Sequence, residues 1–468
     1  MNAAALSGRS PSDVYDLVGV GIGPFNLALA ALADAVPAVR AVFLDAKPEF
    51  SWHPGMLIEG TTLQVPFLAD LVTLVDPTSR WSFLSYLRAH ERLFPFYFAE
   101  RFHVPRREYD HYCRWVAQAL PSCRFGTRVQ RVCFDPAGEV FVVQADAAPG
   151  SPGAASGEPG AASVTVRARN VVLGVGTEPV VPEPLRPVLG KEVFHSADYL
   201  DAVESLHDAT DITVIGSGQS GAEVFADLLR RQDETGWRLR WLTRSPAFAP
   251  MEYSKLGLEH FTPDYTRYFH RLPPATRDEL VPSQWQLYKA ISAETIAEIH
   301  DLLYERGIGG ARPDVTITPS VEVTAAAQLD SGLELSCTHT QQGREFTVQT
   351  DRAVLATGYA PRRPDCLQPL TGLLDLDSHG RYRVDERFRV ALRRDVPAGL
   401  YVQNAEAHTH GVGAPDLGLG AYRAAVILNT IVGRPVYPLP ARTAYTTFSA
   451  PETGAAQDPR CGRPHPRR

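Results

Sequence analysis

The hydrophobic pattern of the chain shows one arrangement twice: a short apolar run, a glycine-rich turn, and then a helical pattern. The first copy begins at Tyr15 and passes its turn to an Ala/Leu-rich stretch that starts at Pro24. The second begins at Asp211 and has glycines at positions 216, 218 and 221. Each copy predicts a buried strand, a tight turn and a helix, and another apolar run follows each helix. The alternation predicts an α/β fold with two Rossmann-like units.

Apolar patterns in the rest of the chain predict further elements around these two units. Aromatic residues at helical spacing predict helices within 81–120, the tyrosine-rich segment 249–306 is mostly helical in pattern, and 421–432 predicts one long helix. Strands are predicted at 164–166, 170–177, 315–323, 333–337, 346–349 and 353–359.

The order of these elements predicts a chain that leaves its first domain and later returns to it. We expect 14–205 and 351–448 to form the first domain and 206–350 the second, with 249–306 inserted as a small substrate-binding region. The segments 1–13, 147–163 and 449–468 are small, polar or rich in proline and arginine. Such segments cannot bury a core, so we expect them to be disordered.

Composition and charge narrow the class of protein. With 468 residues, 44% of them hydrophobic, the chain can fill two or three cores. Its net charge of −7 offers no basic stripe for nucleic acid, and no apolar run approaches the roughly 18 residues of a membrane span. The six cysteines show neither a Cys-x-x-Cys pair nor a metal-ligand spacing, and no signal peptide precedes them. This usage favours the reducing cytoplasm.

The first glycine turn has the chemistry of a dinucleotide site. Gly21 lets the backbone turn sharply, Gly23 lets a pyrophosphate approach the main chain, and the helix from Pro24 directs its N–H groups at that anion. Asp45 ends the next apolar run, where a carboxylate would hold a ribose hydroxyl. Asn26 replaces the third glycine of the usual fingerprint. Alone, this motif is also compatible with an ordinary glycine turn in a parallel sheet.

The second glycine turn argues against that ordinary explanation, because two such motifs are hard to produce by chance. Its spacing is the complete Gly-x-Gly-x-x-Gly, and the next apolar run ends on Arg244 instead of an acid, which suits the 2′-phosphate of NADP. We therefore predict FAD at the first turn and NADPH at the second. The predicted NADPH contacts are Gly216, Gly218, Gln219, Ser220, Gly221, Arg244 and Ser245.

Four motifs occur in a characteristic order after the first turn: Phe50-Ser-Trp-His-Pro-Gly-Met56, the second glycine turn, Ala356-Thr-Gly-Tyr359 and Thr409-His-Gly411. This order resembles the N-hydroxylating flavoprotein monooxygenases of siderophore biosynthesis, a family of lysine N6-, ornithine N5- and diamine N-hydroxylases. The resemblance spans about residues 14–448 and implies the class B flavin monooxygenase architecture. It also implies that NADPH reduces FAD, that reduced FAD takes up O2, and that a C4a-hydroperoxyflavin hydroxylates a substrate nitrogen.

The resemblance places the cofactor contacts residue by residue. No catalytic acid or base is expected, and Gln64 is the amide best placed to position the flavin ring. The implied FAD contacts are Gly21, Gly23, Pro24, Asn26, Asp45, Trp52, His53, Gln64, Val129, Pro415, Asp416 and Leu417.

The same resemblance bears on the substrate. In the amino-acid hydroxylases a lysine inside Phe-Leu-x-Asp-Leu pairs with the substrate carboxylate, and Ala69 stands there in this chain. Other ornithine-binding positions fall at Leu258, Leu287 and Gly418. A carboxylate buried without its cation would lose about 3 to 5 kcal/mol, so we expect a diamine, cadaverine or putrescine. A substitute Arg or Lys in a shifted pocket remains an alternative.

Further expectations follow from the diamine interpretation. Segments 63–77, 251–263 and 408–418 look most like the cadaverine N-monooxygenase of desferrioxamine assembly. The far ammonium of a diamine needs an acceptor, and the candidates are Glu252, Glu259, Glu406 and Asp416. Family members are often dimers or tetramers, so a homo-oligomer is expected.

Two classes of alternative stay open at this point. One is another flavin enzyme: a lysine or ornithine hydroxylase, or a pyridine nucleotide-disulfide reductase. The reductase is disfavoured because a closely spaced cysteine pair does not follow the first motif. The other is a non-catalytic flavin-binding protein.

Overall fold

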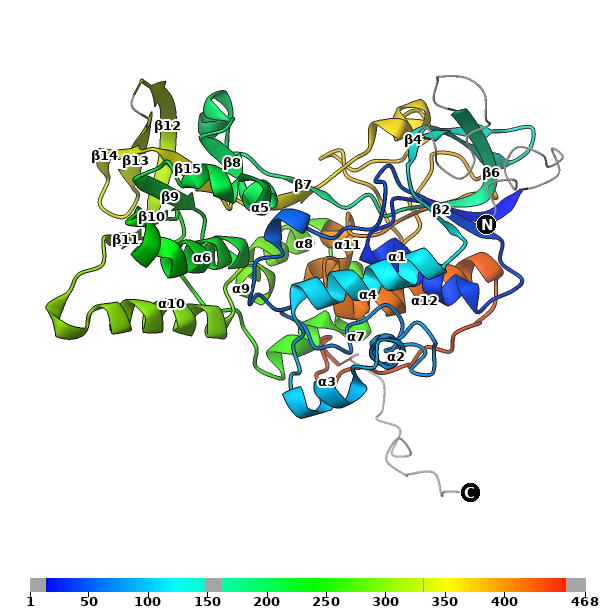
Figure 1. Ribbon diagram of the computed structural model, residues 1–468. Coiled ribbons are helices and arrows are strands. Elements are labelled where there is room, and N and C mark those ends of the chain that lie inside the picture. The colour runs from blue at the N-terminus through cyan, green and yellow to red at the C-terminus, as the bar shows by residue number, and fades with distance from the viewer. Residues whose placement is uncertain (1–13, 148–161, 331, 452–468) are drawn as a thin grey trace.

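The computed structural model describes residues 14–147, 162–330 and 332–451, and its two largest sheets lie in two separate lobes (Figure 1). Most of the predicted disordered segments, 1–13, 148–161 and 452–468, lies outside the described residues. The ends of the predicted segment 147–163 belong to strands, because Ala147 pairs with Ala162 in an antiparallel ladder.

The first lobe is built on a seven-stranded sheet. Its strands are β1 (Tyr15–Val20), β2 (Ala41–Leu44), β3 (Cys123–Arg124), β4 (Thr127–Asp135), β5 (Val140–Ala147), β6 (Ala162–Leu173) and β17 (Gly399–Val402). They lie in the order β3-β2-β1-β6-β5-β4, with β17 also paired to β6. β1 is parallel to both β2 and β6, so the turn after β1 lies at the carboxyl edge of the parallel strands.

Helices cover one face of this sheet. α1 (Pro24–Asp34) packs against α4 (Arg106–Ala119) and α12 (Gly420–Val432), and the three lie together in Figure 1. α2 (Phe83–Ala89) and α3 (Leu93–Ala99) lie beyond them. The other face packs against 366–402, including η7 (Asp365–Leu370).

The second lobe is built on an all-parallel sheet in the order β11-β10-β9-β15-β8. Its strands are β8 (Val193–His195), β9 (Asp211–Ile215), β10 (Arg238–Leu242), β11 (Val315–Thr318) and β15 (Arg352–Leu355). α6 (Gln219–Thr235) and α10 (Ala293–Arg306) pack together on one side. An antiparallel sheet of β12 (Val321–Leu329), β13 (Gly332–His339) and β14 (Arg344–Thr350) packs on the other face through a shared apolar cluster.

The segment between β10 and β11 is mostly helical, as the pattern predicted. It contains η5 (Gly257–Phe261), α7 (Pro263–Arg271), α8 (Pro274–Ser283), α9 (Trp285–Tyr288) and α10. α7 and α8 do not stay with the second sheet, because they pack against α11 (Ala407–His410) from the late part of the chain.

One predicted strand is two strands in the structure. The apolar run 315–323 breaks because Ser320 adopts a left-handed backbone with φ 59°. The chain turns there from β11 of the parallel sheet into β12 of the antiparallel sheet. The apolar pattern alone does not reveal the break, because both strands are partly buried.

Several contacts between described residues join the lobes. β7 (Thr177–Pro179) and β16 (Tyr359–Pro361) form an antiparallel pair where the chain crosses between them. Met56 and Ile58, from the loop after β2, are buried in the apolar core of the second lobe. Arg106 at the start of α4 forms a 2.7 Å ion pair with Glu223 of α6, and both side chains are largely buried.

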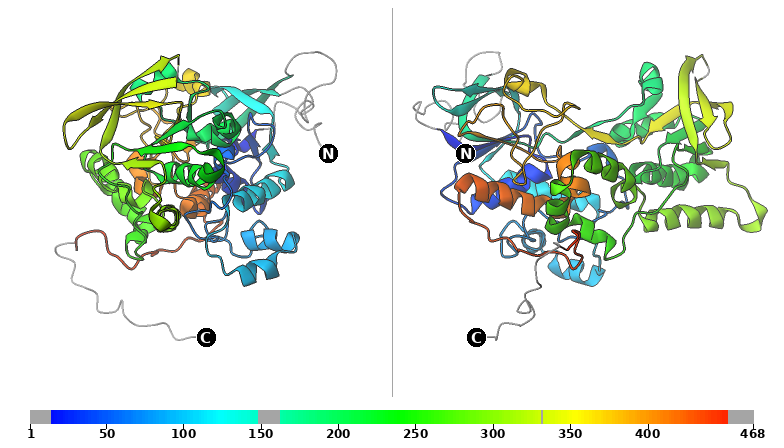
Figure 2. Two further views of the ribbon diagram at one scale, coloured as in Figure 1. Left: turned by 60° about the vertical axis from the view of Figure 1, so that its left-hand side comes forward. Right: turned by 180° about the vertical axis from the view of Figure 1, so that it is seen from behind.

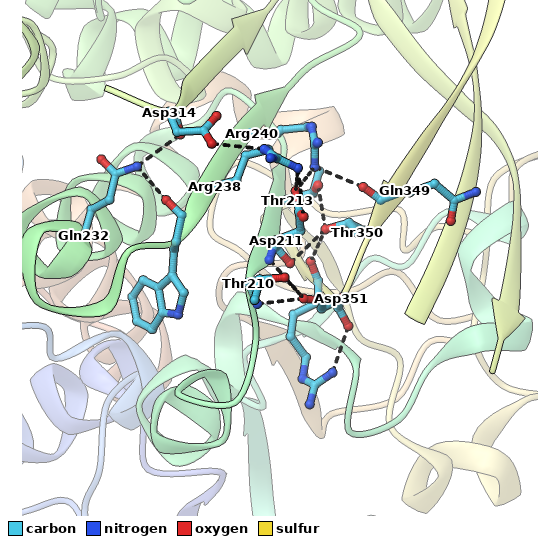
Figure 3. A network of polar contacts seen from close by, with 12 residues as sticks. Thr210, Asp211, Thr213, Gln232, Arg238, Arg240, Asp314, Gln349, Thr350 and Asp351 are labelled. Atoms are coloured by element: carbon cyan, nitrogen blue, oxygen red, sulfur yellow. Dashed lines mark hydrogen bonds and ion pairs between the residues drawn. The ribbon is translucent and has the colours of Figure 1, made fainter. Parts of the chain in front are cut away.

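A polar network closes the amino-terminal edge of the second sheet, opposite its glycine turn (Figure 3). The Asp351 carboxylate accepts hydrogen bonds from Thr210 N (2.7 Å), Thr210 Oγ1 (2.8 Å) and Asp211 N (3.0 Å). Asp211 in turn pairs with Arg240 at 2.6 Å and with Arg238 at 3.2 Å. Burial alone would raise the pKa of Asp351, but these hydrogen bonds and the charge of Arg352 lower it.

Replacing Asp351 by asparagine should lower the free energy of unfolding by about 1 to 3 kcal/mol at pH 7, because charge-assisted hydrogen bonds are lost. The folded-state pKa is depressed, so the carboxylate contributes stability above its unfolded-state pKa of about 4 and loses it as the pH falls through the folded-state value. The difference in the free energy of unfolding between wild type and Asp351→Asn, measured by denaturant unfolding, should therefore shrink as the pH falls from 7 toward 3. Asp208→Asn, at an exposed carboxylate, is the control. Equal stability of the two variants at pH 7 would contradict this role for Asp351.

Candidate functional site

The first glycine turn is shaped to admit a ligand along its backbone. Gly21 has φ 87°, and a Cβ there would lie 2.4 Å from Gly174 O, so this position requires glycine. Gly23 caps α1, and its nearest atom to a built Cβ is Gly174 O at 4.0 Å. With Pro24 at the first turn of the helix, the free N–H groups of α1 face this space. The turn fits the pyrophosphate of a dinucleotide.

Asn26 supports the turn from inside the protein. Its side chain is fully buried, and Nδ2 donates to Gly21 O at 2.8 Å and to Val20 O at 3.2 Å. Its Oδ1 accepts a 2.7 Å hydrogen bond from Gln403 Nε2. Asn26 therefore holds the backbone of the turn, and its predicted contact with FAD stays a prediction.

Asp45 and Val129 lie beside the same turn. The Asp45 carboxylate accepts from Ile22 N at 2.6 Å and from Lys47 N at 2.8 Å. Asp45 O accepts from Thr127 N at 2.7 Å, which brings β4 and its partly buried Val129 alongside. This is the side of the turn where the ribose end of a nucleotide was predicted.

The loop after β2 presents Trp52 and His53 next to α4. Trp52 N donates to Asp110 Oδ1 at 2.8 Å, and its ring meets Tyr109 edge to face at 5.1 Å. His53 has φ 47° and begins η1 (Pro54–Met56). One side of the His53 side chain is open to solvent. Burial on its other sides lowers the pKa of His53 to about 4, and the positive charges of Arg106 and Lys47 act in the same direction. His53 is therefore neutral at pH 7 and available as a hydrogen-bonding or stacking group.

Gln64 lies where two distant segments meet. Its backbone oxygen accepts a 3.2 Å hydrogen bond from Tyr253 OH, and its Nε2 lies 4.0 Å from Met251 Sδ. The segment 251–253 follows β10 in the chain and belongs to the inserted region between β10 and β11. This junction therefore brings the inserted region against the first lobe. The predicted role of Gln64 in positioning the flavin stays a prediction.

Ala69 is held rigidly beside Gly418. The adjacent Asp70 is buried and accepts from Val72 N at 3.0 Å, Thr73 N at 2.7 Å and Phe83 N at 2.7 Å. Ala69 itself is buried, and a Cβ built on Gly418 would lie 3.8 Å from the Ala69 Cβ. Two of the four predicted substrate positions are thus neighbours in space.

Asp416 places a carboxylate beside the Ala69–Gly418 contact. Its Oδ1 accepts a 2.7 Å hydrogen bond from Gly418 N at the start of η9 (Leu417–Leu419), and burial raises its pKa to about 6. Burial first, then the charges of Glu294 and Asp416, raise the pKa of Tyr253 to about 12. Asp416 therefore lies within electrostatic reach of Tyr253 as well as beside the Ala69–Gly418 contact.

The other predicted positions are distributed around this centre. Pro415 is exposed, and Leu417 packs on the core beneath α1 and α12. Leu258 is 38% exposed on η5, and Leu287 on α9 packs in the apolar cluster of Phe269 and Val412. Contact of these two leucines with a substrate stays a prediction.

All four candidate carboxylates have protein partners. Glu259 accepts from Tyr445 N at 2.9 Å and Thr446 N at 2.7 Å, and Glu252 accepts from Ser254 N at 2.5 Å. Glu406 is fully buried against the guanidinium of Arg423. Asp416, which accepts from Gly418 N, is the candidate that lies beside the Ala69–Gly418 contact.

The Glu406–Arg423 pair is a feature that the sequence analysis missed. Their atoms Oε1 and Nη1 lie 2.8 Å apart, with side-chain exposures of 0% and 2%. Arg423 Nη2 also donates to Ala414 O at 2.6 Å, and the guanidinium lies 4.6 Å from the ring centroid of Phe25. Arg423 thus ties the loop before Asp416 to the first helix after the glycine turn. The available signal was a lone cation inside the apolar run 421–432.

The second glycine turn has the close packing that its spacing predicts. Gly216 has φ 125°, and a Cβ there would lie 2.1 Å from Ala356 O. A Cβ on Gly221 would lie 2.4 Å from Gly216 O, so α6 packs directly on the turn. Gly218 caps α6 in an extended conformation, as Gly23 caps α1. This turn also fits a pyrophosphate.

Side chains around the second turn divide into two groups. Ser245 Oγ accepts a 3.0 Å hydrogen bond from Ser217 Oγ within the turn, and the neighbouring Arg244 is exposed. This places the predicted 2′-phosphate partners at the turn. Gln219, in contrast, accepts from Ser292 N at 2.8 Å and donates to Glu223 at 2.8 Å, so its amide fastens α6 to α10. Ser220 is half-buried in the first turn of α6.

The structure has two glycine turns at the carboxyl ends of parallel strands, and loops of both lobes meet between them. These features define a flavoprotein oxidoreductase with two dinucleotide sites. The chain belongs to the L-lysine 6-monooxygenase/L-ornithine 5-monooxygenase family, whose model matches residues 13–361. It is therefore an N-hydroxylating monooxygenase of the type that uses FAD and NADPH.

Individual relatives are similar along nearly the whole chain. The rhizobactin siderophore biosynthesis protein RhbE of Rhizobium meliloti is 45% identical over 94% of this chain and 96% of its own. A putrescine N-hydroxylase of Shewanella oneidensis is 42% identical over 93% of this chain and 84% of its own. The FAD-bound cadaverine monooxygenase DfoA of Erwinia amylovora superposes with a TM-score of 0.88 at 39% identity, covering 94% and 99% of the two chains.

These findings separate the alternatives that the sequence left open. A bacillithiol disulfide reductase of Bacillus cereus shares the fold, with a TM-score of 0.57 at 16% identity. The family match and the relatives above assign the chain to the monooxygenases instead. Within the residues that the structure describes, no helix is long and apolar enough to cross a membrane, and no group of three or more side chains could hold a metal ion.

Proposed function

We propose that this enzyme hydroxylates one primary amine of an aliphatic diamine, cadaverine or putrescine, as the first step toward a hydroxamate siderophore. One observation carries the proposal: Ala69 and Gly418 are neighbours, and the carboxylate of Asp416 lies beside them. An acidic site attracts an ammonium and repels the carboxylate of lysine or ornithine. Similarity to the putrescine N-hydroxylase and to the cadaverine monooxygenase supports the same substrate class.

Asp416 is the proposed acceptor for the distal ammonium. The carboxylate accepts from backbone N–H groups that include Gly418 N, and its remaining lone pairs can accept a charge-assisted hydrogen bond from the substrate. The distance from this anchor to the site of oxygen transfer would then select the length of the diamine.

The reacting amine must be neutral, and the chain's own groups favour this form. Bound flavin, reduced by NADPH, supplies the activated oxygen. Met251 and Tyr253 meet Gln64 at the junction, and desolvation by side chains of this kind lowers the pKa of an amine. Lowering it from about 10.4 to near 7 corresponds to roughly 4 to 5 kcal/mol. The protein therefore orients the substrate and excludes water, and it needs no dedicated base.

The test is product formation from the FAD-loaded enzyme with NADPH and O2, offered cadaverine, putrescine, L-lysine and L-ornithine in separate reactions. Mass spectrometry should detect a mono-N-hydroxylated diamine with at least about 100-fold preference over either amino acid, the selectivity expected from roughly 3 kcal/mol. Preferred hydroxylation of lysine or ornithine would contradict the proposal and would require a cation for the carboxylate. NADPH oxidation without product from all four amines would indicate a different substrate class.

The organisation of the enzyme is part of the same proposal. We divide it into a first domain of 14–205 and 351–448 and a second of 206–350 that contains the insertion 249–306. The five cysteines of the described residues are unpaired, which supports a cytoplasmic location. We also propose that the enzyme is a homo-oligomer, a tetramer or dimer.

A further inference from the structure

The chain that follows α12 returns to the inserted helical region. After α12 ends at Val432, the chain runs along the lower side of the molecule as drawn and reaches α7 (Figures 1 and 2). We call residues 441–448 the carboxy-terminal strap. Within the described residues, no backbone–backbone hydrogen bond involves the strap. Its position therefore depends on side-chain contacts.

Two carboxylates of the inserted region hold the strap. Glu259 on η5 uses both oxygens, because Oε1 accepts from Tyr445 N at 2.9 Å and Oε2 accepts from Thr446 N at 2.7 Å. At the start of α7, Asp264 Oδ2 accepts from Thr443 Oγ1 at 2.9 Å, and Thr443 Oγ1 accepts from Asp264 N at 3.2 Å. Hydrogen bonds from Thr446 and Tyr445 lower the pKa of Glu259, so this carboxylate is ionised at pH 7.

Phe448 fastens the strap through its ring. It meets Tyr265 edge to face at 5.0 Å and stacks on Tyr268 at 6.0 Å, and both tyrosines belong to α7. It also meets His260 of η5 edge to face at 5.5 Å. The strap therefore contacts both η5 and α7, through polar groups at 443–446 and through an aromatic ring at 448.

The helix α7 also lies against the loop that leads to Asp416. A Cβ built on Gly411 would lie 3.1 Å from Phe269 Cγ, and one built on Gly413 would lie 3.9 Å from Thr266 Oγ1. Asp416 N donates to Gly413 O at 3.1 Å. Because α7 is in contact with 411–413, a shift of α7 would displace the loop that carries Asp416.

We propose that the carboxy-terminal strap positions the substrate site, and that Glu259 acts through the strap as a positioning residue. The proposal rests on the proposed diamine activity, because it takes Asp416 and Leu258 of η5 as parts of the substrate site. With the strap held, η5 and α7 are fixed against the loop of Asp416. With the strap released, these parts of the site move and amines bind more weakly. This role differs from that of an ammonium ligand, because it affects amines with and without a distal ammonium alike.

The first measurement is amide hydrogen exchange of the FAD-loaded full chain, followed by mass spectrometry. Glu259→Ala removes the acceptor of two strap amides, so peptides from the strap should exchange about 5- to 20-fold faster, as expected for one or two lost hydrogen bonds. Thr446→Pro removes one of the two donors and should have a similar effect without changing a carboxylate. Glu279→Ala is the matched control, at an exposed carboxylate on α8 of the same inserted region, and should leave the exchange unchanged. Circular dichroism and flavin absorption verify that each variant is folded and loaded.

The second measurement is steady-state kinetics with cadaverine and with pentylamine, which lacks the distal ammonium. Glu259→Ala and Thr446→Pro should lower kcat/KM for both amines by the same factor, about 5- to 20-fold. For cadaverine the loss should lie in KM, while kcat and the anaerobic rate of flavin reduction by NADPH stay within about 2-fold of wild type.

Several results would overturn the proposal. A loss for cadaverine alone would make Glu259 an ammonium ligand. Unchanged exchange in both variants, or faster exchange without a change in kcat/KM, would show that the strap does not position the site. A matching fall in the rate of flavin reduction would show a general structural role instead.

The strap and the diamine activity are tested separately. Hydrogen exchange needs no substrate, so its outcome does not depend on the identity of the amine. If wild type hydroxylated lysine or ornithine instead, the diamine proposal would fail, and the same fall in kcat/KM would be expected for that amino acid if the strap positions the site.

Discussion

Asp416→Asn should reduce kcat/KM for cadaverine and putrescine by roughly 30- to 150-fold, which corresponds to about 2 to 3 kcal/mol for a lost charge-assisted hydrogen bond. The reason is local. Each of the four candidate carboxylates has a protein partner, and Asp416, held by Gly418 N, is the one that lies beside the Ala69–Gly418 contact. Asparagine keeps the shape and an acceptor oxygen for Gly418 N, so the loss reports on charge.

A monoamine of matched length separates recognition from chemistry. Pentylamine lacks the distal ammonium, so wild type should process it poorly and Asp416→Asn should change its kcat/KM by less than about 3-fold. Equal losses for cadaverine and pentylamine would instead assign Asp416 to the flavin or to the loop structure. Glu252→Gln is the control at an exposed candidate carboxylate and should leave both amines unaffected.

The pH dependence provides an independent check on the same variant. With its pKa raised to about 6, Asp416 is ionised at pH 7.5 and becomes protonated as the pH falls through 6, and the protonated form cannot hold an ammonium by charge. The ratio of kcat/KM for cadaverine to that for pentylamine should therefore fall in wild type below pH about 6. In Asp416→Asn the ratio should be flat, because ionisation of the reacting amine cancels between the two substrates.

Arg423→Met should lower the free energy of unfolding by about 3 to 5 kcal/mol, because it leaves Glu406 buried without its cation. The melting temperature should fall by roughly 3 to 5 °C if the chain unfolds as one unit. Burial raises the pKa of Glu406, and the charge of Arg423 opposes this rise. Without Arg423, Glu406 should take up a proton when the variant folds. The loss of stability relative to wild type should therefore be smaller in acid. Calorimetry of the FAD-loaded protein at pH 5.5 and pH 8 measures both effects.

The double variant Glu406→Gln/Arg423→Met tests whether the loss comes from the unpaired charge. Removing both charges should recover at least half of the lost stability, since the desolvation penalty of the carboxylate disappears. If the double variant were as unstable as Arg423→Met, the hydrogen bond to Ala414 O and the packing on Phe25 would account for the effect instead.

The parts of the fold that were predictable are those where local geometry limits the residue type. Gly21 and Gly216 both have positive φ and lie against carbonyl oxygens that no side chain could tolerate, so glycine at these positions carries information. The buried strands before them are apolar on both faces, as parallel strands covered by helices must be. Turn and strand together made both nucleotide sites visible from sequence.

The parts that were not predictable depend on contacts between distant segments. Asn26 occupies a glycine position, but its partner Gln403 is 377 residues away, so its supporting role was invisible. Glu406 and Arg423 each look like ordinary surface charges in the sequence, and only their burial together makes them a pair. The neighbourhood of Ala69 and Gly418 likewise arises only when the late loop folds back on the first lobe.

The loop after β2 limits how the second lobe, with the NADPH turn, can move relative to the first lobe, with the FAD turn. Met56 and Ile58 are anchored in the core of the second lobe, while Trp52 of the same loop is fastened to α4 of the first. A hinge opening of the lobes as rigid bodies would have to extract these apolar side chains into water, at about 1.5 to 3 kcal/mol each, and separate Arg106 from Glu223. The loop therefore acts as a tether, and a displacement of the second lobe that keeps Met56 and Ile58 in its core must also pull on Trp52 and His53, two of the predicted flavin contacts.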